Sequence, residues 1–196
     1  MLNAIFRRIF PDRDRSAPAS PASAVYGSIV AQARQPVFYA DLGVPDTPTG
    51  RFEMIVLHAI PVFRRLKGTQ ELDDAGQAVF DLFISDMDRS LRELGVGDLS
   101  VPKQMKHIGQ AFYGHASVYG GALDQRDPEK VAEAVQQNVF ATNENRAELA
   151  VESRAIGDYL IACDGAVAQQ DPEPILGGEI AWPPLPGATA QEESAR

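Results

Sequence analysis

Hydrophobic residues recur at helical spacing through most of the middle of the chain. Between residues 50 and 66 they form one stripe of six positions: Phe52, Ile55, Val56, Ala59, Phe63 and Leu66. Leu57, Ile60 and Val62 make the same segment apolar almost all round, which predicts a central helix. A second stripe follows between about residues 71 and 94: Phe80, Phe83, Ile84, Met87, Leu91 and Leu94. The pattern therefore predicts two long consecutive helices.

Helix-ending and helix-starting residues divide the rest of the chain. Gly95 is the kind of residue that takes the left-handed conformation at a helix end, and Ser100 with Pro102 predicts the start of the next helix. Asp127 and Asn143 predict two further starts, the last helix running through residue 167, and residues 24–35 predict a first helix. Strand patterns are essentially missing. We expect an all-α domain of about six helices.

The two ends of the chain differ from this middle part, so we expect a domain over residues 24–170. Residues 1–23 combine a short amphipathic segment with a Pro/Ser/Ala-rich linker. Residues 171–196 hold five prolines and predict an extended tail without helix, disordered at its end. Residues 36–48 carry three prolines and predict an irregular connection.

The N-terminal segment has the pattern of a cationic helix lying on an anionic membrane surface. Arg7 and Arg8 flank one apolar helical face, which consists of Leu2, Ile5, Phe6 and Ile9. Two alternatives stay open: a frayed terminus, and an organelle transit peptide, which Asp12 and Asp14 disfavour.

Composition narrows the classes of function. The net charge of −9 and the pI of 4.8 argue against nucleic acid as the main partner. The single cysteine, Cys163, excludes an intrachain disulfide framework and a thiolate zinc site. The sequence contains no Glu-x-x-His pair and no phosphate-binding glycine loop. We therefore expect no catalytic residues, no metal and no cofactor.

Charged residues crowd the end of the second long helix. Asp88 and Arg92 are four residues apart in the favourable order for an ion pair on a helix surface. This pattern is more typical of a solvated, ion-paired helix face than of a reaction centre.

The helix predicted after Ser100 contains several glycines, each of which disfavours a helix by about 0.8–1 kcal/mol relative to alanine. Gly109, Tyr113, Ala116 and Gly120 fall on one strip beside its apolar stripe. Small residues on one face let another helix approach closely. The strip therefore fits either internal packing or a groove for a helix of another protein, and the residues alone leave both open.

The run from Phe80 to Leu123 resembles the ubiquinol–cytochrome c chaperone family, whose members share an LRE-x-G-V-G-D turn followed by AFYG and a tyrosine. The matching residues are Asp86, Asp88, Leu91, Arg92, Glu93, Gly95, Gly97, Asp98, Val101, Lys106, Phe112, Tyr113, Gly114 and Tyr119. The resemblance covers roughly residues 50–165. His115 departs from it, because the family pattern has arginine after that glycine, so a role for a cation there becomes doubtful or dependent on pH.

The resemblance implies an all-α, non-enzymatic assembly factor that binds newly made cytochrome b of ubiquinol–cytochrome c reductase. On this basis we expect client contacts at Asp88, Arg92, Lys106, Gly109, Tyr113, Ala116 and Gly120. We expect Gly95, Gly97, Asp98 and Ser100 to brace the corner between two helices. The expected location is the cytoplasmic side of a bacterial inner membrane, or the matrix side of the mitochondrial one. The alternative is a helical adaptor or regulatory domain with another client.

Overall fold

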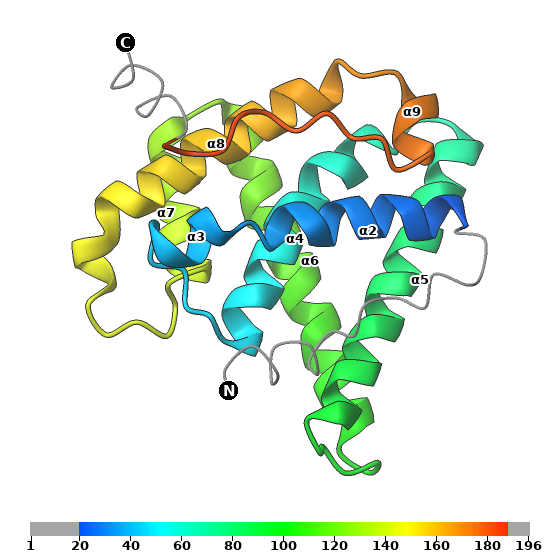
Figure 1. The fold of residues 1–196 in the computed structure, drawn as a ribbon, viewed down its shortest axis with the longest axis horizontal. Helices are drawn as coiled ribbons and strands as arrows, with labels where there is room; N and C mark the ends of the chain where they lie inside the picture. Colours follow the sequence, from blue (N-terminus) through cyan, green and yellow to red (C-terminus); the bar gives the residue numbers. More distant parts are fainter. Residues whose placement is uncertain (1–19, 188–196) are drawn as a thin grey trace.

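The computed structural model describes residues 20–187, and the regular secondary structure in that range is helical (Figure 1). Six helices have eleven or more residues: α2 (Pro21–Ala33), α4 (Pro48–Arg65), α5 (Gln70–Glu93), α6 (Val101–Gln125), α7 (Pro128–Asn138) and α8 (Ala150–Ala168). The short elements are α3 (Pro36–Ala40), a 3-10 helix (Arg146–Leu149) and α9 (Pro172–Leu176). The all-α prediction is confirmed.

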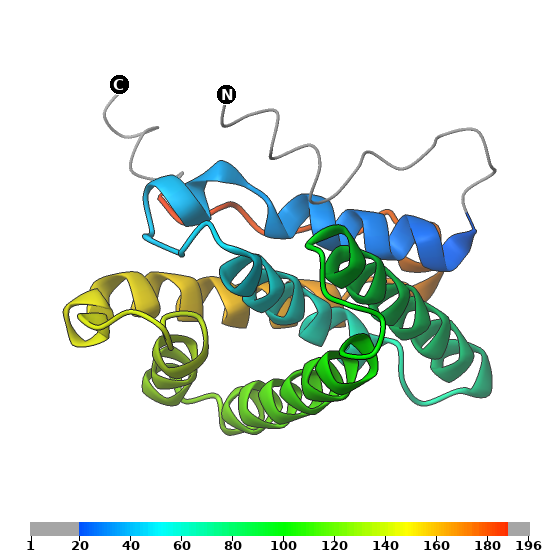
Figure 2. The same cartoon turned by 90° about the horizontal axis from the view of Figure 1, so that it is seen from below.

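Helix α4 is the centre of the fold, as its nearly uniform apolar sequence predicts. Its residues from Met54 to Val62 are all buried. It packs against α2, α6 and α8, and Figure 2 shows it enclosed by these three helices. Because α4 faces neighbours on several sides, it fixes the positions of the helices around it.

Helices α5 and α6 form a long antiparallel hairpin. Val79, Phe83 and Met87 of α5 are buried, and α5 packs on α2 as well as on α6. The hydroxyl of Tyr26 on α2 donates a hydrogen bond to Asp86 of α5 at 2.8 Å. The connection between the hairpin helices, residues 94–100, projects beyond the other described elements (Figure 1). We call it the α5–α6 corner.

The predictions that used proline as a sign of irregular structure were wrong in three places. Helix α2 begins at Pro21, inside the predicted linker, and α3 and α9 begin at Pro36 and Pro172. Proline fits the first helical position, where its fixed φ is suitable and its missing amide has no helical partner. In these segments proline therefore starts a helix instead of preventing one.

The C-terminal segment is attached to the domain over its described part, residues 171–187. The side-chain amide of Gln170 exchanges two hydrogen bonds of 2.9 Å with the backbone of Ala181. The indole of Trp182 donates to Ser28 of α2 at 3.3 Å. The prediction of a tail without helix is thus wrong at Pro172–Leu176, whereas residues 177–187 hold no helix and contact the rest of the domain. The predicted disorder at the end of the chain falls outside the described residues.

Candidate functional site

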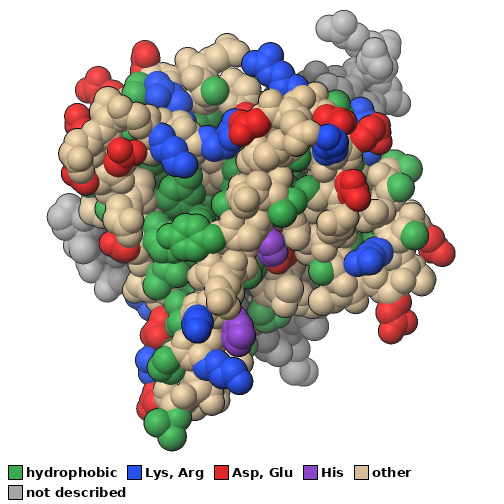
Figure 3. Space-filling model, turned by 180° about the vertical axis from the view of Figure 1, so that it is seen from behind, with side chains coloured by type: hydrophobic (Ala, Val, Ile, Leu, Met, Phe, Trp, Pro, Cys, Tyr) green, Lys and Arg blue, Asp and Glu red, His purple; other side chains and the backbone are tan. Residues whose placement is uncertain are grey.

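A groove of about 500 Å³ opens between the C-terminal half of α4, the N-terminal half of α5 and the C-terminal half of α6. We call it the α4–α6 groove. Its lining consists of Ile60, Phe63, Arg64, Leu66, Lys67, Asp73, Gly76, Gln77, Phe80, Phe112, Tyr113, Ala116, Ser117, Gly120, Gly121 and Asp124. Figure 3 shows hydrophobic side chains gathered in a hollow near the middle of this face.

The small residues of α6 keep the groove open. A Cβ atom added at Gly120 would meet only the Arg64 guanidinium, at 3.8 Å, and one added at Gly121 would meet nothing within 4 Å. Ala116 and Ser117 continue the same side of the helix. If another helix of the same chain packed against this strip, its side chains would fill the space beside Gly120 and Gly121. The described residues therefore favour the interpretation of the strip as a groove.

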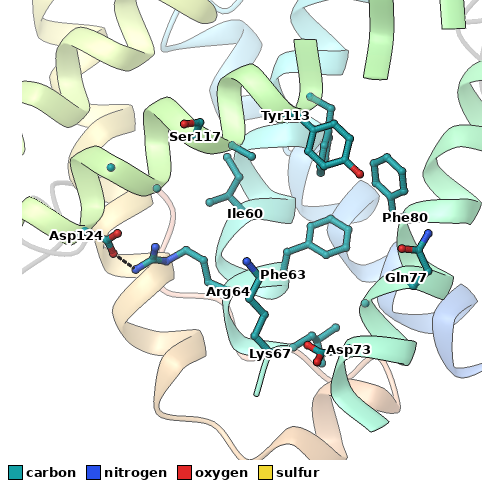
Figure 4. Close-up of a pocket in the computed structure, with 16 residues that line it drawn as sticks. Ile60, Phe63, Arg64, Lys67, Asp73, Gln77, Phe80, Tyr113, Ser117 and Asp124 are labelled. Atoms are coloured by element: carbon teal, nitrogen blue, oxygen red, sulfur yellow. Dashed lines mark hydrogen bonds and ion pairs between the residues drawn. The ribbon is translucent and has the colours of Figure 1, made fainter. Parts of the chain in front are cut away.

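One end of the groove is aromatic. The ring of Phe80 lies 5.1 Å from that of Phe112 and 5.5 Å from that of Tyr113. The rings of Phe63 and Phe112 meet edge to face at 5.6 Å. Phe112 is buried, whereas 64% of Tyr113 is exposed. The aromatic end is thus an apolar floor with one accessible ring at its rim (Figure 4).

The other end of the groove is polar. Arg64 donates to Asp124 of α6 and to Asp164 of α8, each at 2.8 Å. Partial burial opposes the positive charge of Arg64, but the two carboxylates outweigh it and raise the pKa of the guanidinium. Lys67 and Asp73 add one more side chain of each sign to the lining (Figure 4). The groove therefore combines an apolar floor with a charged end.

The structure divides the residues predicted for client binding into two groups. Tyr113, Ala116 and Gly120 line the groove. Gly109 lies one turn nearer the α5–α6 corner, outside the lining, and a Cβ there would meet nothing within 4 Å. Asp88, Arg92 and Lys106 also lie in the corner halves of their helices, so the structure does not bring these four residues into the groove.

The corner residues form a bracing network. Gly95 has φ +82°, the left-handed conformation that its position predicts. Arg92 binds Asp88 at 2.7 Å and Asp98 at 2.5 Å. Ser100 precedes α6 but does not cap it with its side chain, because its own backbone is already helical, with φ −96° and ψ −24°. The amides of Ser100 and Val101 donate instead to the carbonyl of Gly97.

A buried polar contact joins α4 to α6 on the other side of the α6 core stripe. Nδ1 of His115 lies 2.9 Å from Oε2 of the buried Glu53. Burial raises the pKa of Glu53, although the nearby His115 opposes this effect. Glu53 also lines a smaller hollow of about 340 Å³ with Phe52, Met87 and Ile108. His115 is therefore a partly buried polar residue that faces Glu53 at the edge of the core.

Sequence reasoning missed the parts of the groove that α4 and α5 supply. Phe63 and Phe80 each belong to an apolar stripe, so the pattern gives no sign that they reach a surface hollow. Arg64 and Asp164 are 100 residues apart, and no short-range pattern connects them. The feature that reveals the groove is the divergence of α5 and α6 away from their corner, which is visible only in the folded structure.

Two observations on the described residues concern metal binding and thiol reactivity. They contain no group of three or more His, Cys, Asp or Glu side chains able to hold a metal ion. Burial raises the pKa of the Cys163 thiol to about 12, so little of the reactive thiolate forms at neutral pH. None of the described helices is both long and apolar enough to cross a membrane.

Comparisons with known proteins place the chain in a family. The profile of the family described as Ubiquinol-cytochrome C chaperone matches residues 40–182. The crystal structure of the Cbp3 homologue from Brucella abortus is similar, with 37% sequence identity and a TM-score of 0.75. The match covers 94% of this chain and 97% of that one. No curated protein matches. The chain is therefore a member of the ubiquinol–cytochrome c chaperone family.

Proposed function

We propose that this protein binds newly made cytochrome b and promotes the assembly of ubiquinol–cytochrome c reductase at the inner membrane, without catalysing a reaction. Membership of the chaperone family supports a client within that reductase. The α4–α6 groove supports a binding role, since it combines an apolar, aromatic floor with a few polar groups at one end. Cytochrome b as the client, and the inner membrane as the place of action, rest on the resemblance of the chain to its family.

The observation that carries the proposal is the row of small residues beside the exposed ring of Tyr113. Ala116, Gly120 and Gly121 leave room for a helix backbone to come close, as small residues do between helices in lipid. Tyr113 and Phe80 offer aromatic contacts for apolar side chains of that helix. An apolar helix of a membrane subunit that has not yet met its permanent neighbours fits this surface.

The test uses a substitution that fills the groove with a side chain and leaves the fold intact. Gly120→Leu places a side chain where a Cβ meets only the Arg64 guanidinium at 3.8 Å. Gly114→Leu is the matched control, because Gly114 is exposed on the same helix, lies outside the lining and also gains helix propensity. Each variant is used for affinity capture from solubilised membranes, and the amount of cytochrome b is measured.

We expect the natural chain and Gly114→Leu to enrich cytochrome b, and Gly120→Leu to lose most of it. Equal capture by both variants would place client binding elsewhere on the molecule. Enrichment of a different protein that Gly120→Leu abolishes would support the adaptor alternative, with the groove as its binding site.

A further inference from the structure

The α5–α6 corner carries large apolar side chains that the fold does not cover. Leu99 is 99% exposed and Leu94 is 49% exposed. Both lie within residues 94–100, at the projecting end of the hairpin. Single exposed leucines are ordinary on protein surfaces, but two within six residues at the outermost point of the fold concentrate apolar area where a partner surface meets it first.

Positive charge lies directly behind these leucines. Lys103, Lys106 and Arg89 are exposed, the two lysines on the first two turns of α6 and the arginine near the end of α5. Residues 88–107 contain four Lys or Arg and three Asp or Glu. In the whole chain the acidic residues predominate instead, with 18 Lys or Arg and 27 Asp or Glu. Two of the three acids, Asp88 and Asp98, are bound to Arg92, and Glu93 is the third. Figure 3 shows hydrophobic side chains at the end of the projection, with Lys or Arg and Asp or Glu side chains a short way behind.

We propose that the α5–α6 corner is a membrane-contact site, which inserts Leu94 and Leu99 at the surface of an anionic phospholipid bilayer. An apolar end followed by cations matches the order of a bilayer surface, where acyl chains lie beneath anionic headgroups. The acidic remainder of the chain is repelled by such a surface, so contact through the corner also fixes which end of the molecule faces the lipid.

The conformation of the corner suits this role. Gly95 with φ +82° and the Arg92 pairs with Asp88 and Asp98 hold the connection in one shape. The leucines are therefore presented without a loop having to order on contact, which lowers the entropic cost of binding. Binding of lipid at the corner requires no client protein, so it can be tested separately from client binding in the α4–α6 groove.

The first test measures whether residue 99 of the corner enters the lipid bilayer. The natural cysteine, Cys163, is fully buried, so a thiol-reactive, environment-sensitive dye labels an introduced Leu99→Cys selectively. We expect its emission to shift to shorter wavelength with vesicles of phosphatidylcholine and phosphatidylglycerol, and to stay unchanged with phosphatidylcholine alone. Val151→Cys is the matched control, because Val151 is 77% exposed on α8. No shift at residue 99, or equal shifts at both positions, would overturn the proposal.

The second test measures binding of the full chain to the same vesicles by sedimentation. Leu94→Ser with Leu99→Ser should weaken partition at least about tenfold, which corresponds to half-burial of two leucine side chains. Lys103→Glu or Lys106→Glu should each weaken it about fivefold, and Lys130→Glu on α7 much less. Unchanged partition would contradict the proposal. So would a chain that self-associates without vesicles and loses that association in Leu99→Ser, since the corner would then contact a second copy.

Discussion

Phe112 and Tyr113 are neighbours in the sequence but differ in environment. Phe112 is buried among the rings of Phe63, Phe80 and Phe83, whereas Tyr113 is mostly exposed at the rim of the groove. Phe112→Ala should lower the free energy of unfolding by about 3–5 kcal/mol because it leaves a cavity. Tyr113→Ala should change stability little and weaken capture of cytochrome b. Thermal melts and capture from the same membranes check both. A Tyr113→Ala chain that unfolds, or that binds its client normally, contradicts the assignment.

His58 makes stability depend on pH. It is fully buried on α4, and Nδ1 lies 2.7 Å from the Met54 carbonyl. Burial lowers its pKa from 6.5 to about 4, although the bond to Met54 opposes this. Between these values the unfolded chain binds a proton that the folded chain excludes. The contribution of His58 to stability is therefore complete above about pH 6.5 and falls by roughly 3 kcal/mol as the pH drops to about 4.

His58→Phe tests this dependence, since it keeps an aromatic ring beside Phe38, Tyr159 and Trp182 and removes the titration. Urea unfolding at about pH 7 and about pH 4 should show a smaller loss of stability in the variant than in the natural chain. His107→Gln on exposed α6 surface is the control and should behave like the natural chain. The same acid-dependent loss in all three proteins would show that His58 is not the cause.

At the scale of elements, the α5–α6 corner depends on the backbone of a single glycine. Gly95 has φ +82°, which a β-branched residue tolerates badly, while Gly97 is not among the positive-φ glycines and has open space around it. Gly95→Val should lower the free energy of unfolding by about 1–2 kcal/mol, and Gly97→Val should have a smaller effect. Calorimetry or chemical denaturation compares the two. Equal stability of Gly95→Val and the natural chain would refute the argument.

The elements themselves were largely predictable because their apolar stripes are long. The observed ends of α4 and α5 lie within two residues of the predicted ones, since Gly95 and the stripes mark them. The short helices α3 and α9 were missed because five residues carry too little periodicity and begin with proline. The strip with Gly120 and Tyr113 indicated either a groove on α6 or internal packing, and the sequence alone left both open. The α4 and α5 sides were not predictable, because the angle at which helices diverge is set by tertiary packing.

At the scale of the whole molecule, the sequence predicts a second membrane contact in the N-terminal segment, which lies outside the described residues. If Leu2, Ile5, Phe6 and Ile9 form an interfacial helix, Arg7→Glu with Arg8→Glu should release protein from anionic vesicles. High salt should partly reproduce that release, because it screens attraction to the headgroups. Vesicle sedimentation and circular dichroism check binding and folding together. A chain lacking residues 2–10 that stays folded and binds as well as the full chain would rule out this contact.

The two carboxylates that hold Arg64 have a consequence for how long a client stays bound. By joining α4 to α6 and α8, Arg64 fixes the charged end of the α4–α6 groove in the folded chain before any client arrives. Occupying a preformed apolar site should give a negative heat-capacity change, with the loss of freedom falling on the client. The rate of release is then set by the contacts of the complex itself. As the permanent neighbours of the client accumulate, they should capture a released client before it rebinds, so the supply of those subunits would set the pace of assembly.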